Sequence, residues 1–379
     1  LLYEVFTAVS DEARVKNRQA IARGDVGQYA GLTFWTPNIN IFRDPRWGRG
    51  METYGEDPFL TGCLGCAVVR GLQGPSDAPV LKAHACAKHY AVHSGPESLR
   101  HTFNAEVTER DLRETYLPAF KDLVTKADVQ EVMIAYNRFR GQPCGASDYL
   151  VGDILRGEWG YKGLVVSDCG AISNFFEPGC HDYTTDAAHA VAAAVHTGTD
   201  LNCGDAYRHI PEAVTQGLLD EADVDRSVIR LLAARLRLGE LNHDTTPWQH
   251  LTDDIVEGDR HRALARQMAQ ETMVLLHNKG VLPLAGTKEM SSDPDAPTSP
   301  SLALIGPNAD NREMMWGNYN SIPDSTLTLA EALRERIPDL VTFKACDYTD
   351  GLEDAILQRL EGIATVIFAG GISPHLEGE

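Results

Sequence analysis

The 379-residue sequence contains 34 lysine and arginine residues against 54 aspartate and glutamate residues, so its formal net charge is −20. This acidic excess argues against a nucleic-acid or anionic-membrane surface and favours a neutral or small substrate. Hydrophobic residues make up 43% of the chain. No apolar run approaches the roughly 20 residues that a membrane span needs, so we expect no membrane span.

Eight cysteines are scattered along the chain. Cys63 and Cys66 form a lone C-x-x-C pair in an apolar stretch, and no second pair follows at the spacing of a zinc site. We interpret them as buried thiols. The chain begins at Leu1 inside a predicted helix, without an initiator methionine, and ends at Glu379 soon after a predicted strand. We therefore interpret it as a fragment of a longer protein.

Residues 1–30 are predicted to form a helix, because apolar residues recur along them at helical spacing. The stripe consists of Val5, Ala8, Val9 and Ala13. A short apolar run at 31–38 closes in a turn, and the loop 41–50 after it is dense in arginine, tryptophan and glycine. Planar guanidinium and indole groups on a loop suit polar ligands that carry hydroxyl groups.

From residue 61 to residue 202 the sequence alternates between predicted helices and strands. Strands are predicted over 83–90, 132–137 and 164–166. Helices are predicted over 61–72, from the capping residue Thr108, from the capping residue Ser147 to Gly160, and from Asp186 to Gly198. The residues expected to be buried on the second and third helices are Leu112, Tyr116, Phe120, Leu123, Leu150, Ile154 and Leu155.

The ends of the predicted strands carry polar groups. These ends fall near Thr36, Lys88, Tyr136, Asp168 and Asp200. The alternation indicates a parallel sheet covered by helices on both faces, and polar groups that converge at the strand ends are typical of a TIM-barrel active site. Asp168 follows the buried run 164–166, and small residues after it leave room for a ligand. The barrel is expected to be incomplete, because its first strand would precede Leu1.

A second α/β unit is predicted after residues 240–257, which lose the apolar periodicity. A helix at 260–277 and an exposed loop at 285–300, rich in serine, proline and aspartate, follow. Strands are then predicted over 302–305, 340–343 and 364–369, and helices over 327–337 and 352–360. We divide the chain into a partial barrel domain (1–242), a linker (243–257) and a partial α/β sandwich domain (258–379).

Several sequence blocks resemble family 3 of the glycoside hydrolases. They are RDPRWGRGMETYGEDP (43–58), AKHYAVHSGPE (87–97), AEVTERDLRETYLPAF (105–120), VMIAYNRFRGQPC (132–144), GLVVSDCGAI (163–172), TGTDLNCG (197–204) and LIGPNADN (304–311). The resemblance implies an N-terminally truncated (β/α)8 TIM-type barrel, followed by a C-terminally truncated, doubly wound α/β sandwich domain. It also implies a retaining hydrolase without a cofactor, periplasmic or secreted, that removes β-linked sugars from the non-reducing ends of oligosaccharides and other β-glycosides.

The resemblance assigns two catalytic carboxylates. Asp168 falls at the nucleophile of the family, although an aspartate in such a segment, taken on its own, more often caps a helix or binds a turn amide. Glu377, just after the last predicted strand, falls at the general acid/base. Glu379 is the alternative, because a shift of two residues is easy in a variable loop.

The resemblance also places four side chains around the sugar at the non-reducing end or beside the nucleophile. They are Arg49, Lys88, His89 and Tyr136. A plain core role stays open for Tyr136. Arg43 and Arg46 are instead expected to form structural ion pairs with nearby carboxylates. Those carboxylates are Asp44, Glu52 and Glu56. Asp200 is also expected to have a structural role.

The residues after the nucleophile bear on the substrate. Many glucosidase-like members of the family carry tryptophan there, whereas this chain has Cys169. Together with segment 200–204 this resembles the xylosidase-like branch, so we expect a β-xylosidase acting on xylo-oligosaccharides, with a β-glucosidase as the alternative. N-acetylhexosaminidases of the family follow Lys-His with Pro-Gly-His, and residues 90–93 differ from that segment.

Two other classes of function were weighed against hydrolysis by carboxylates. His84, His89 and His93 suggest a metal, but spacings of five and four across a strand end do not place three imidazoles around one ion. We therefore expect no catalytic metal. A sugar-binding domain that has lost catalysis is the second alternative, since fold alone does not establish activity. The presence of both Asp168 and Glu377 favours the enzyme.

Overall fold

The computed structural model describes residues 1–241, 246–284, 302–317, 319–320, 323–344, 346–347, 354–373 and 376. The chain separates into two compact units, Leu1–Thr272 and Met273–Glu379. The first unit includes helix α8 (Asp259–Thr272), which the sequence had grouped with the second domain, and α8 packs against the first helix of the chain. None of the helices in the described ranges has the length and apolar composition that crossing a bilayer requires.

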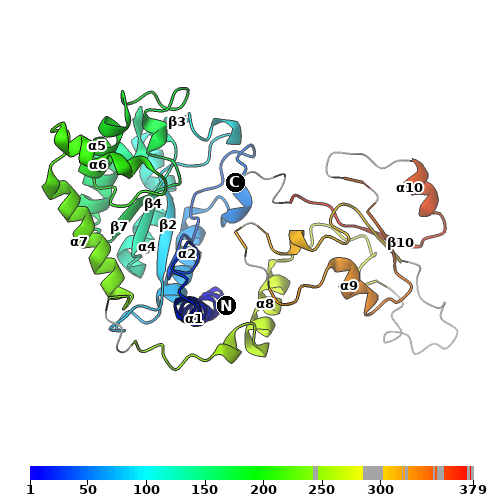
Figure 1. Ribbon diagram of the computed structural model, residues 1–379. Coiled ribbons are helices and arrows are strands. Elements are labelled where there is room, and N and C mark those ends of the chain that lie inside the picture. Colours follow the sequence, from blue (N-terminus) through cyan, green and yellow to red (C-terminus); the bar gives the residue numbers. More distant parts are fainter. Residues whose placement is uncertain are drawn as a thin grey trace. The chain divides into compact units, whose positions relative to one another are not determined.

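A four-stranded parallel sheet forms the centre of the first unit (Figure 1). Its order is β1 (Thr33–Phe34), β2 (His84–Tyr90), β4 (Glu131–Ile134) and β7 (Leu164–Ser167). Single bridges join Asn38 to Lys88 and Val166 to Leu201 at its two sides. Because all four strands are parallel, their carboxyl ends meet at one edge. The α/β architecture with a parallel sheet that the sequence predicted is confirmed.

Apolar side chains pack against both faces of this sheet. Successive strand residues point to opposite sides, so each strand contributes side chains to both faces. The large core between the sheet and the helices includes Ala87, Val132, Ile134 and Val165. A smaller cluster on the opposite face consists of Cys86, Met133 and Val166, with Trp35 and Leu201 against it. A strand buried on both faces needs an apolar residue at nearly every position. This is why β4 and β7 contain unbroken apolar runs, at 132–134 and 164–166, whereas β2 also carries His84, Lys88 and His89.

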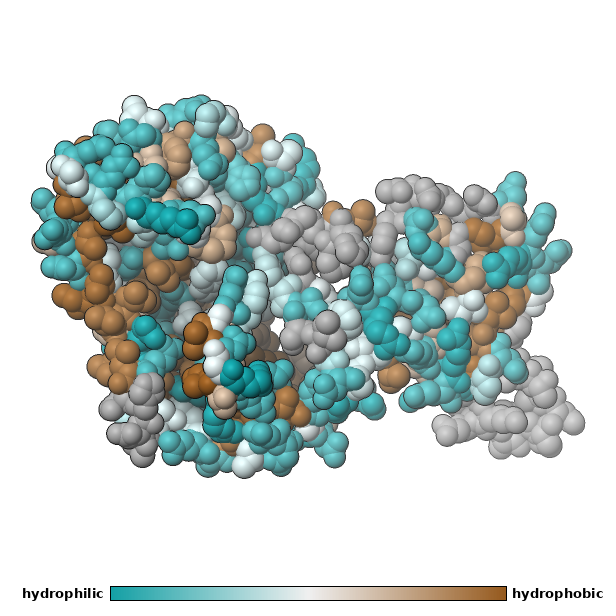
Figure 2. Space-filling model, viewed as in Figure 1, coloured by the Kyte–Doolittle hydropathy of each residue, from teal (hydrophilic) through white to brown (hydrophobic). Residues whose placement is uncertain are grey.

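Helices surround the strands of the first unit (Figure 1). Besides α8 they are α1 (Leu2–Ala22), α2 (Pro58–Gln73), α3 (Glu109–Asp111), α4 (Pro118–Ala127), α5 (Ala187–Thr197), α6 (Ile210–Thr215) and α7 (Glu221–Arg237). Wide helical turns of the π type span Leu112–Tyr116 and Asp148–Glu158. Helices α6 and α7 were not predicted. Apolar side chains gather on the outer face of α7 (Figure 2), where Val228, Ile229, Leu232 and Leu236 are exposed.

Helix α1 differs from its prediction in length and in its buried face. It ends at Ala22 rather than at residue 30, shortly before Gly24, whose φ is +76°. The predicted stripe is only half-buried, and its member Val9 is exposed. Arg14 is buried instead, because its guanidinium donates to the carbonyl oxygens of Lys82 and Leu238. A polar side chain therefore takes a core position through partners that are remote in sequence.

The three predicted helix caps are confirmed. Thr108 Oγ1 accepts the N–H of Asp111 at 3.1 Å, and Ser147 Oγ accepts that of Leu150 at 3.3 Å. Asp186 Oδ1 accepts the N–H of His189 at 3.0 Å, and each bond satisfies a donor that the first helical turn leaves without a partner. The residues predicted to be buried on the helices after Thr108 and Ser147 are buried, except that Tyr116 is half-buried.

The second unit contains a three-stranded parallel sheet. Its order is β10 (Thr365–Phe368), β8 (Leu302–Ile305) and β9 (Val341–Phe343), and its helices are α9 (Leu329–Arg334) and α10 (Asp354–Arg359). Its core consists of Leu302, Leu304, Ala309, Ala330, Leu340 and Ala369. Each strand and helix predicted here is present, with shorter helices. The predicted exposed loop 285–300 lies outside the described residues.

A small second sheet in the first unit braces two loops beside the strand ends. It consists of β3 (Asn104–Ala105), β5 (Arg138–Phe139) and β6 (Gln142–Pro143). Because β3 follows β2 and β5 follows β4, their pairing ties together the segments that leave two neighbouring strands of the main sheet. These segments carry much of the candidate site.

Candidate active site

Asp168 lies at the carboxyl end of β7 and is 5% exposed. Its Oδ1 accepts the N–H of Cys169 at 2.8 Å. Its Oδ2 lies 3.5 Å from His89 Nε2 and 4.0 Å from Arg49 Nη1. The guanidinium stabilises the ionised carboxylate. The structure therefore brings Asp168, His89 and Arg49 together, from three segments that are far apart in sequence.

Arg49 is held in place by Glu52. The Nε and Nη2 atoms of Arg49 donate to Glu52 Oε1 and Oε2 at 2.7 and 2.9 Å, a bidentate pair, and the Arg49 side chain is 1% exposed. Burial tends to raise the pKa of Glu52, but the hydrogen bonds and charge of Arg49 outweigh it and lower that pKa. Glu52 thus orients the guanidinium whose Nη1 lies near Asp168.

Asn40 fixes the tautomer of His89. The amide nitrogen of Asn40 donates to the His89 carbonyl oxygen at 2.8 Å, so Asn40 Oδ1 is an acceptor, and it lies 2.9 Å from His89 Nδ1. Nδ1 therefore carries the proton. Burial, and then the charge of Arg49, hold the pKa of His89 well below its ordinary value. The ring is neutral, and its Nε2 offers a lone pair beside Asp168 to a hydroxyl donor.

Lys88 and Tyr136 complete the set of predicted site residues. Lys88 is 8% exposed, and its pKa is lowered by burial and by Arg49, against the opposing effect of Glu52 and Asp168. Tyr136 is buried, and its hydroxyl donates to the carbonyl oxygen of Cys169 at 2.8 Å. Tyr136 therefore packs in the core and also contacts the residue that follows Asp168.

The charged groups of this site balance. Arg49 and Lys88 carry positive charge, Asp168 and Glu52 carry negative charge, and the neighbouring His89 is neutral. A balanced site of donors, acceptors and two carboxylates, of which Glu52 is bound by Arg49, suits an uncharged ligand rich in hydroxyl groups.

A disulfide between Cys169 and Cys203, which the sequence analysis missed, closes the turn after Asp168. Gly170 N–H also donates to the Cys203 carbonyl oxygen at 2.8 Å, and Leu201 is bridged to β7. The feature of the sequence that could have predicted this disulfide is the position of the two cysteines, since each lies just beyond the end of one of two adjacent parallel segments. The interpretation of Cys63 as a buried thiol is wrong, because it is exposed on α2, whereas Cys66 is buried.

Other predicted residues have structural partners away from Asp168. Arg46 pairs with Asp44 as expected, whereas Arg43 donates to the hydroxyl of Tyr116 at 2.8 Å. Asp200 has the structural role expected of it: its buried carboxylate accepts from Arg156, Arg230, Ser227 and the N–H of Val165. Val165 lies toward the start of β7, whereas Asp168 lies at its end.

The structure bears on the metal alternative but not on the acid/base assignment. Within the described ranges, no three histidine, cysteine, aspartate or glutamate side chains are grouped so that they could hold a metal ion. His84 lies at the first position of β2, whereas His89 lies near its carboxyl end. Glu377 and Glu379 lie outside the described residues.

A buried carboxylate at the end of a parallel strand, among hydrogen-bond donors and acceptors whose charges balance, is the arrangement typical of an enzyme active site. Residues 6–234 match the glycosyl hydrolase family 3 N terminal domain. The chain belongs to glycosyl hydrolase family 3.

Named relatives and solved structures resemble much of the chain. A xylan 1,4-beta-xylosidase of Xylanibacter ruminicola is 48% identical over 92% of this chain and 40% of its own length. A probable beta-D-xylosidase 7 of Arabidopsis thaliana is 38% identical over 88% and 44%. A GH3 exo-beta-xylosidase solved with a xylobiose aziridine probe has a TM-score of 0.87 and 33% identity, over 100% of this chain and 48% of that chain. A beta-glucosidase of Listeria innocua has a TM-score of 0.79 and 28% identity, over 100% and 51%. The chain thus spans about half the length, or less, of these proteins.

Proposed function

We propose that this chain carries the nucleophile of a retaining, exo-acting β-glycosidase that releases β-linked xylose from the non-reducing ends of xylo-oligosaccharides. The observation that carries the proposal is the placement of Asp168 Oδ2 3.5 Å from His89 Nε2 and 4.0 Å from Arg49 Nη1. The names of the relatives support the substrate class, since several are xylosidases.

In the proposed mechanism Asp168 attacks the anomeric carbon while the glycosidic bond to the leaving oxygen breaks. This forms a glycosyl-enzyme ester, and water then displaces Asp168 with net retention of configuration. Arg49 and Lys88 donate to sugar hydroxyls, and the lone pair of His89 Nε2 accepts from one. These bonds strengthen as the oxocarbenium-like state develops.

The second carboxylate is proposed to be Glu377. It would protonate the leaving oxygen in the first step and take a proton from water in the second. The family resemblance supports this position, and Glu379 is the alternative. Rescue of turnover by azide in one of the two alanine variants, and not in the other, separates them.

The disulfide supports a xyloside over a glucoside. Xylose lacks the hydroxymethyl group that glucose carries at C5, so a xylosidase pocket can be filled by protein at that place. Cys169 and Cys203 are joined immediately after Asp168, and we propose that this rigid cross-link forms part of the wall of the sugar pocket. A wall that excludes one group discriminates more strongly than a pocket that merely fails to contact it, which is worth about 1–3 kcal/mol.

The test compares kcat/KM of the full-length protein on an aryl β-xyloside and on the matching β-glucoside. The proposal expects the xyloside to be preferred by roughly tenfold or more. The reverse ranking would establish the β-glucosidase alternative and leave Asp168 in its role. Binding of xylose without turnover of either glycoside would identify a sugar-binding domain instead.

We also infer that the main sheet belongs to a (β/α)8 barrel and that the second unit belongs to a doubly wound α/β sandwich domain. Apolar side chains on both faces of β2, β4 and β7 support the barrel. The position of β8 between β9 and β10 supports a doubly wound arrangement, because the chain then proceeds to opposite sides of its first strand. The domain boundaries at 242 and 258 stay predictions.

A further inference from the structure

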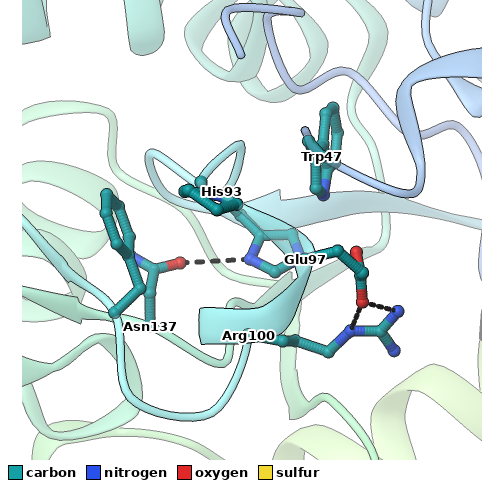
Figure 3. Close-up of a pocket in the computed structure, with 8 residues that line it drawn as sticks. Trp47, His93, Glu97, Arg100 and Asn137 are labelled. Atoms are coloured by element: carbon teal, nitrogen blue, oxygen red, sulfur yellow. Dashed lines mark hydrogen bonds and ion pairs between the residues drawn. The ribbon is translucent and has the colours of Figure 1, made fainter. Parts of the chain in front are cut away.

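A small cavity lies beside the candidate site, between the loop that carries Arg49 and the segment after β2 (Figure 3). Trp47 lines it from the loop, and His93, Glu97 and Asn137 line it from the other side. Its volume is about 10 Å³, taken as the space open to the centre of a water-sized sphere. That is the room that one water molecule occupies.

Two residues that line this cavity each carry a buried polar atom. Trp47 and His93 are each 4% exposed. Among the described residues, neither Trp47 Nε1 nor His93 Nε2 has a hydrogen-bond partner. The rings form an edge-to-face pair with centroids 5.8 Å apart, and Trp47 extends toward His93 in Figure 3. A buried polar atom without a partner carries a cost, which a bridging water removes.

The two atoms have complementary hydrogen-bonding character. The indole Nε1 is a donor only. The amide nitrogen of Asn137 donates to the carbonyl oxygens of Ala91 and Arg138, so its Oδ1, 3.2 Å from His93 Nδ1, is an acceptor. His93 therefore carries its proton on Nδ1, the atom that the dashed line in Figure 3 joins to Asn137. Burial, and then the charge of Arg49, lower the pKa of His93 to about 3, so the ring is neutral. Its Nε2 is an acceptor.

We propose that this cavity holds one ordered water, which accepts the N–H of Trp47 and donates to His93 Nε2, and that Trp47 and His93 are thereby positioning residues for the sugar-binding groups. One oxygen with an O–H and a lone pair satisfies both atoms at once. The second half of the proposal rests on the proposed glycosidase function, whereas the water itself does not.

The bridge would act through the two segments that it joins. Trp47 lies two residues before Arg49, and the ring of His93 lies 4.9 Å from that of His89. Two direct hydrogen bonds already join the segments, since Glu97 Oε2 accepts from Gly48 N–H at 3.0 Å and Glu97 N–H donates to the Arg46 carbonyl oxygen at 3.0 Å. The water adds a third connection, on the side nearer to His89. It thus fixes the spacing between Arg49 and His89 around Asp168.

The structural test is a high-resolution crystal structure of the full-length protein without ligand. We expect one water oxygen within about 3.2 Å of both Trp47 Nε1 and His93 Nε2. A dry cavity, or a water bonded to only one of the two atoms, would overturn the proposal. Nitrogen-15 spectra of the histidines should show His93 neutral with its proton on Nδ1, and the opposite tautomer would also overturn it.

The functional test uses Trp47→Phe, His93→Leu and the double variant. The concentration of active sites is measured by titration with a 2-fluoro-xyloside, and kcat/KM is expressed per active site. Titration removes any loss that comes only from misfolding. We expect about tenfold lower kcat/KM for Trp47→Phe, because a displaced binding group weakens transition-state hydrogen bonds. The kcat/KM of the double variant should be no lower than that of the less active single variant, since each substitution alone already removes the same water bridge. Losses that multiply would contradict a shared water.

Trp248→Phe is the matched control. Its indole N–H donates to the carbonyl oxygen of Val80 at 3.2 Å, near the start of β2 rather than at its carboxyl end. The same atom is thus removed at a place that does not face the sugar, and kcat/KM per titrated site should stay unchanged. An equal loss in Trp248→Phe would assign the effect of Trp47→Phe to general destabilisation. If the parent protein hydrolyses neither glycoside, the proposed function fails, while the crystallographic test of the water still stands.

Discussion

Asp168 and Glu131 are both carboxylates buried near the same sheet, yet their surroundings differ. Glu131, on β4, has burial as the main influence on its pKa, which rises to about 7 despite hydrogen bonds from Trp35 and Cys86. Asp168 lies instead beside the guanidinium of Arg49 and the imidazole of His89. A nucleophile must be ionised in the resting enzyme. The environment, and not the residue type, therefore distinguishes Asp168, the proposed nucleophile, from Glu131.

Asp168→Asn should abolish most of kcat in the full-length protein. The substitution keeps the volume of the side chain but removes the negative charge and the nucleophilic oxygen. A 2-fluoro-xyloside should label the parent protein, and mass spectrometry should place the label on Asp168. Glu131→Gln serves as the control, because it removes a buried carboxyl group that takes no part in the proposed reaction. A label on another carboxylate would refute the assignment.

Lys88→Ala should lower kcat/KM. The loss should correspond to roughly 2–4 kcal/mol of transition-state stabilisation, the usual cost of losing one preorganised donor. Lys88 is buried beside Glu52 and Asp168, so its ammonium group has a fixed direction. Lys82→Ala is the matched control, since Lys82 is equally buried but pairs with Asp11 at 2.7 Å. The control should lose stability and keep its activity per folded molecule. Activity of Lys88→Ala within threefold of the parent would exclude the contact.

At the scale of elements, Asp200 ties β7 to two helical segments. Its carboxylate accepts from Arg156 at 2.7 Å, from Arg230 on α7 at 2.6 Å, and from the N–H of Val165 at 3.0 Å. The side chain of Asp200 has no exposed surface. Removing one partner of such a buried ion pair lowers the free energy of unfolding, because each remaining charge would be left buried without a partner.

Asp200→Asn should therefore reduce the free energy of unfolding by about 3–5 kcal/mol. Equilibrium urea unfolding measures the change. Asp205→Asn is the comparison, because Asp205 pairs with Arg208 on the surface and both side chains are 80% exposed. Exposed pairs contribute little, so this variant should unfold like the parent. Equal midpoints for the two variants would show that the buried network does not stabilise the fold.

At the scale of the whole molecule, buried titratable groups make stability depend on pH. Burial is the main cause that lowers the pKa of His84 and of His93 to about 3, and that holds the pKa of His89 well below 6.5. Below pH 6.5 the unfolded chain takes up protons on these histidines and the folded chain does not, so stability falls with pH. Glu131 acts oppositely, because its folded pKa of about 7 lies above the ordinary 4.5.

Between pH 6 and pH 5, three histidines thus favour unfolding and one carboxyl group favours folding. The net uptake of about two protons on unfolding corresponds to a loss of roughly 3 kcal/mol per pH unit. Urea unfolding at the two pH values should show this loss. His84→Phe should make the free energy of unfolding depend less on pH, since it removes one histidine that favours unfolding in acid. Glu131→Gln should make it depend more on pH, since it removes the carboxyl group that opposes the histidines. Equal stability at pH 6 and pH 5 would contradict the proposed protonation states.

Much of the fold follows from neighbouring residues in the sequence. Unbroken apolar runs predict β4 and β7, because strands buried on both faces need them. Side-chain oxygens at Thr108, Ser147 and Asp186 mark helix starts, because capping depends on atoms within three residues. Asp168 was found in the same way, as a polar residue directly after such a run. These predictions succeed because the interactions behind them are local.

The tertiary structure decided everything that depends on partners remote in sequence. Arg14 occupies the core face of α1 because carbonyl groups near residues 82 and 238 receive it. Cys169 is joined to Cys203, and Trp47 meets His93. The amide oxygens of Asn40 and Asn137 accept from Nδ1 of His89 and of His93, and so select the tautomers of these histidines. Residue types and local spacing specify which groups are available, but only the path of the chain brings their atoms within bonding distance.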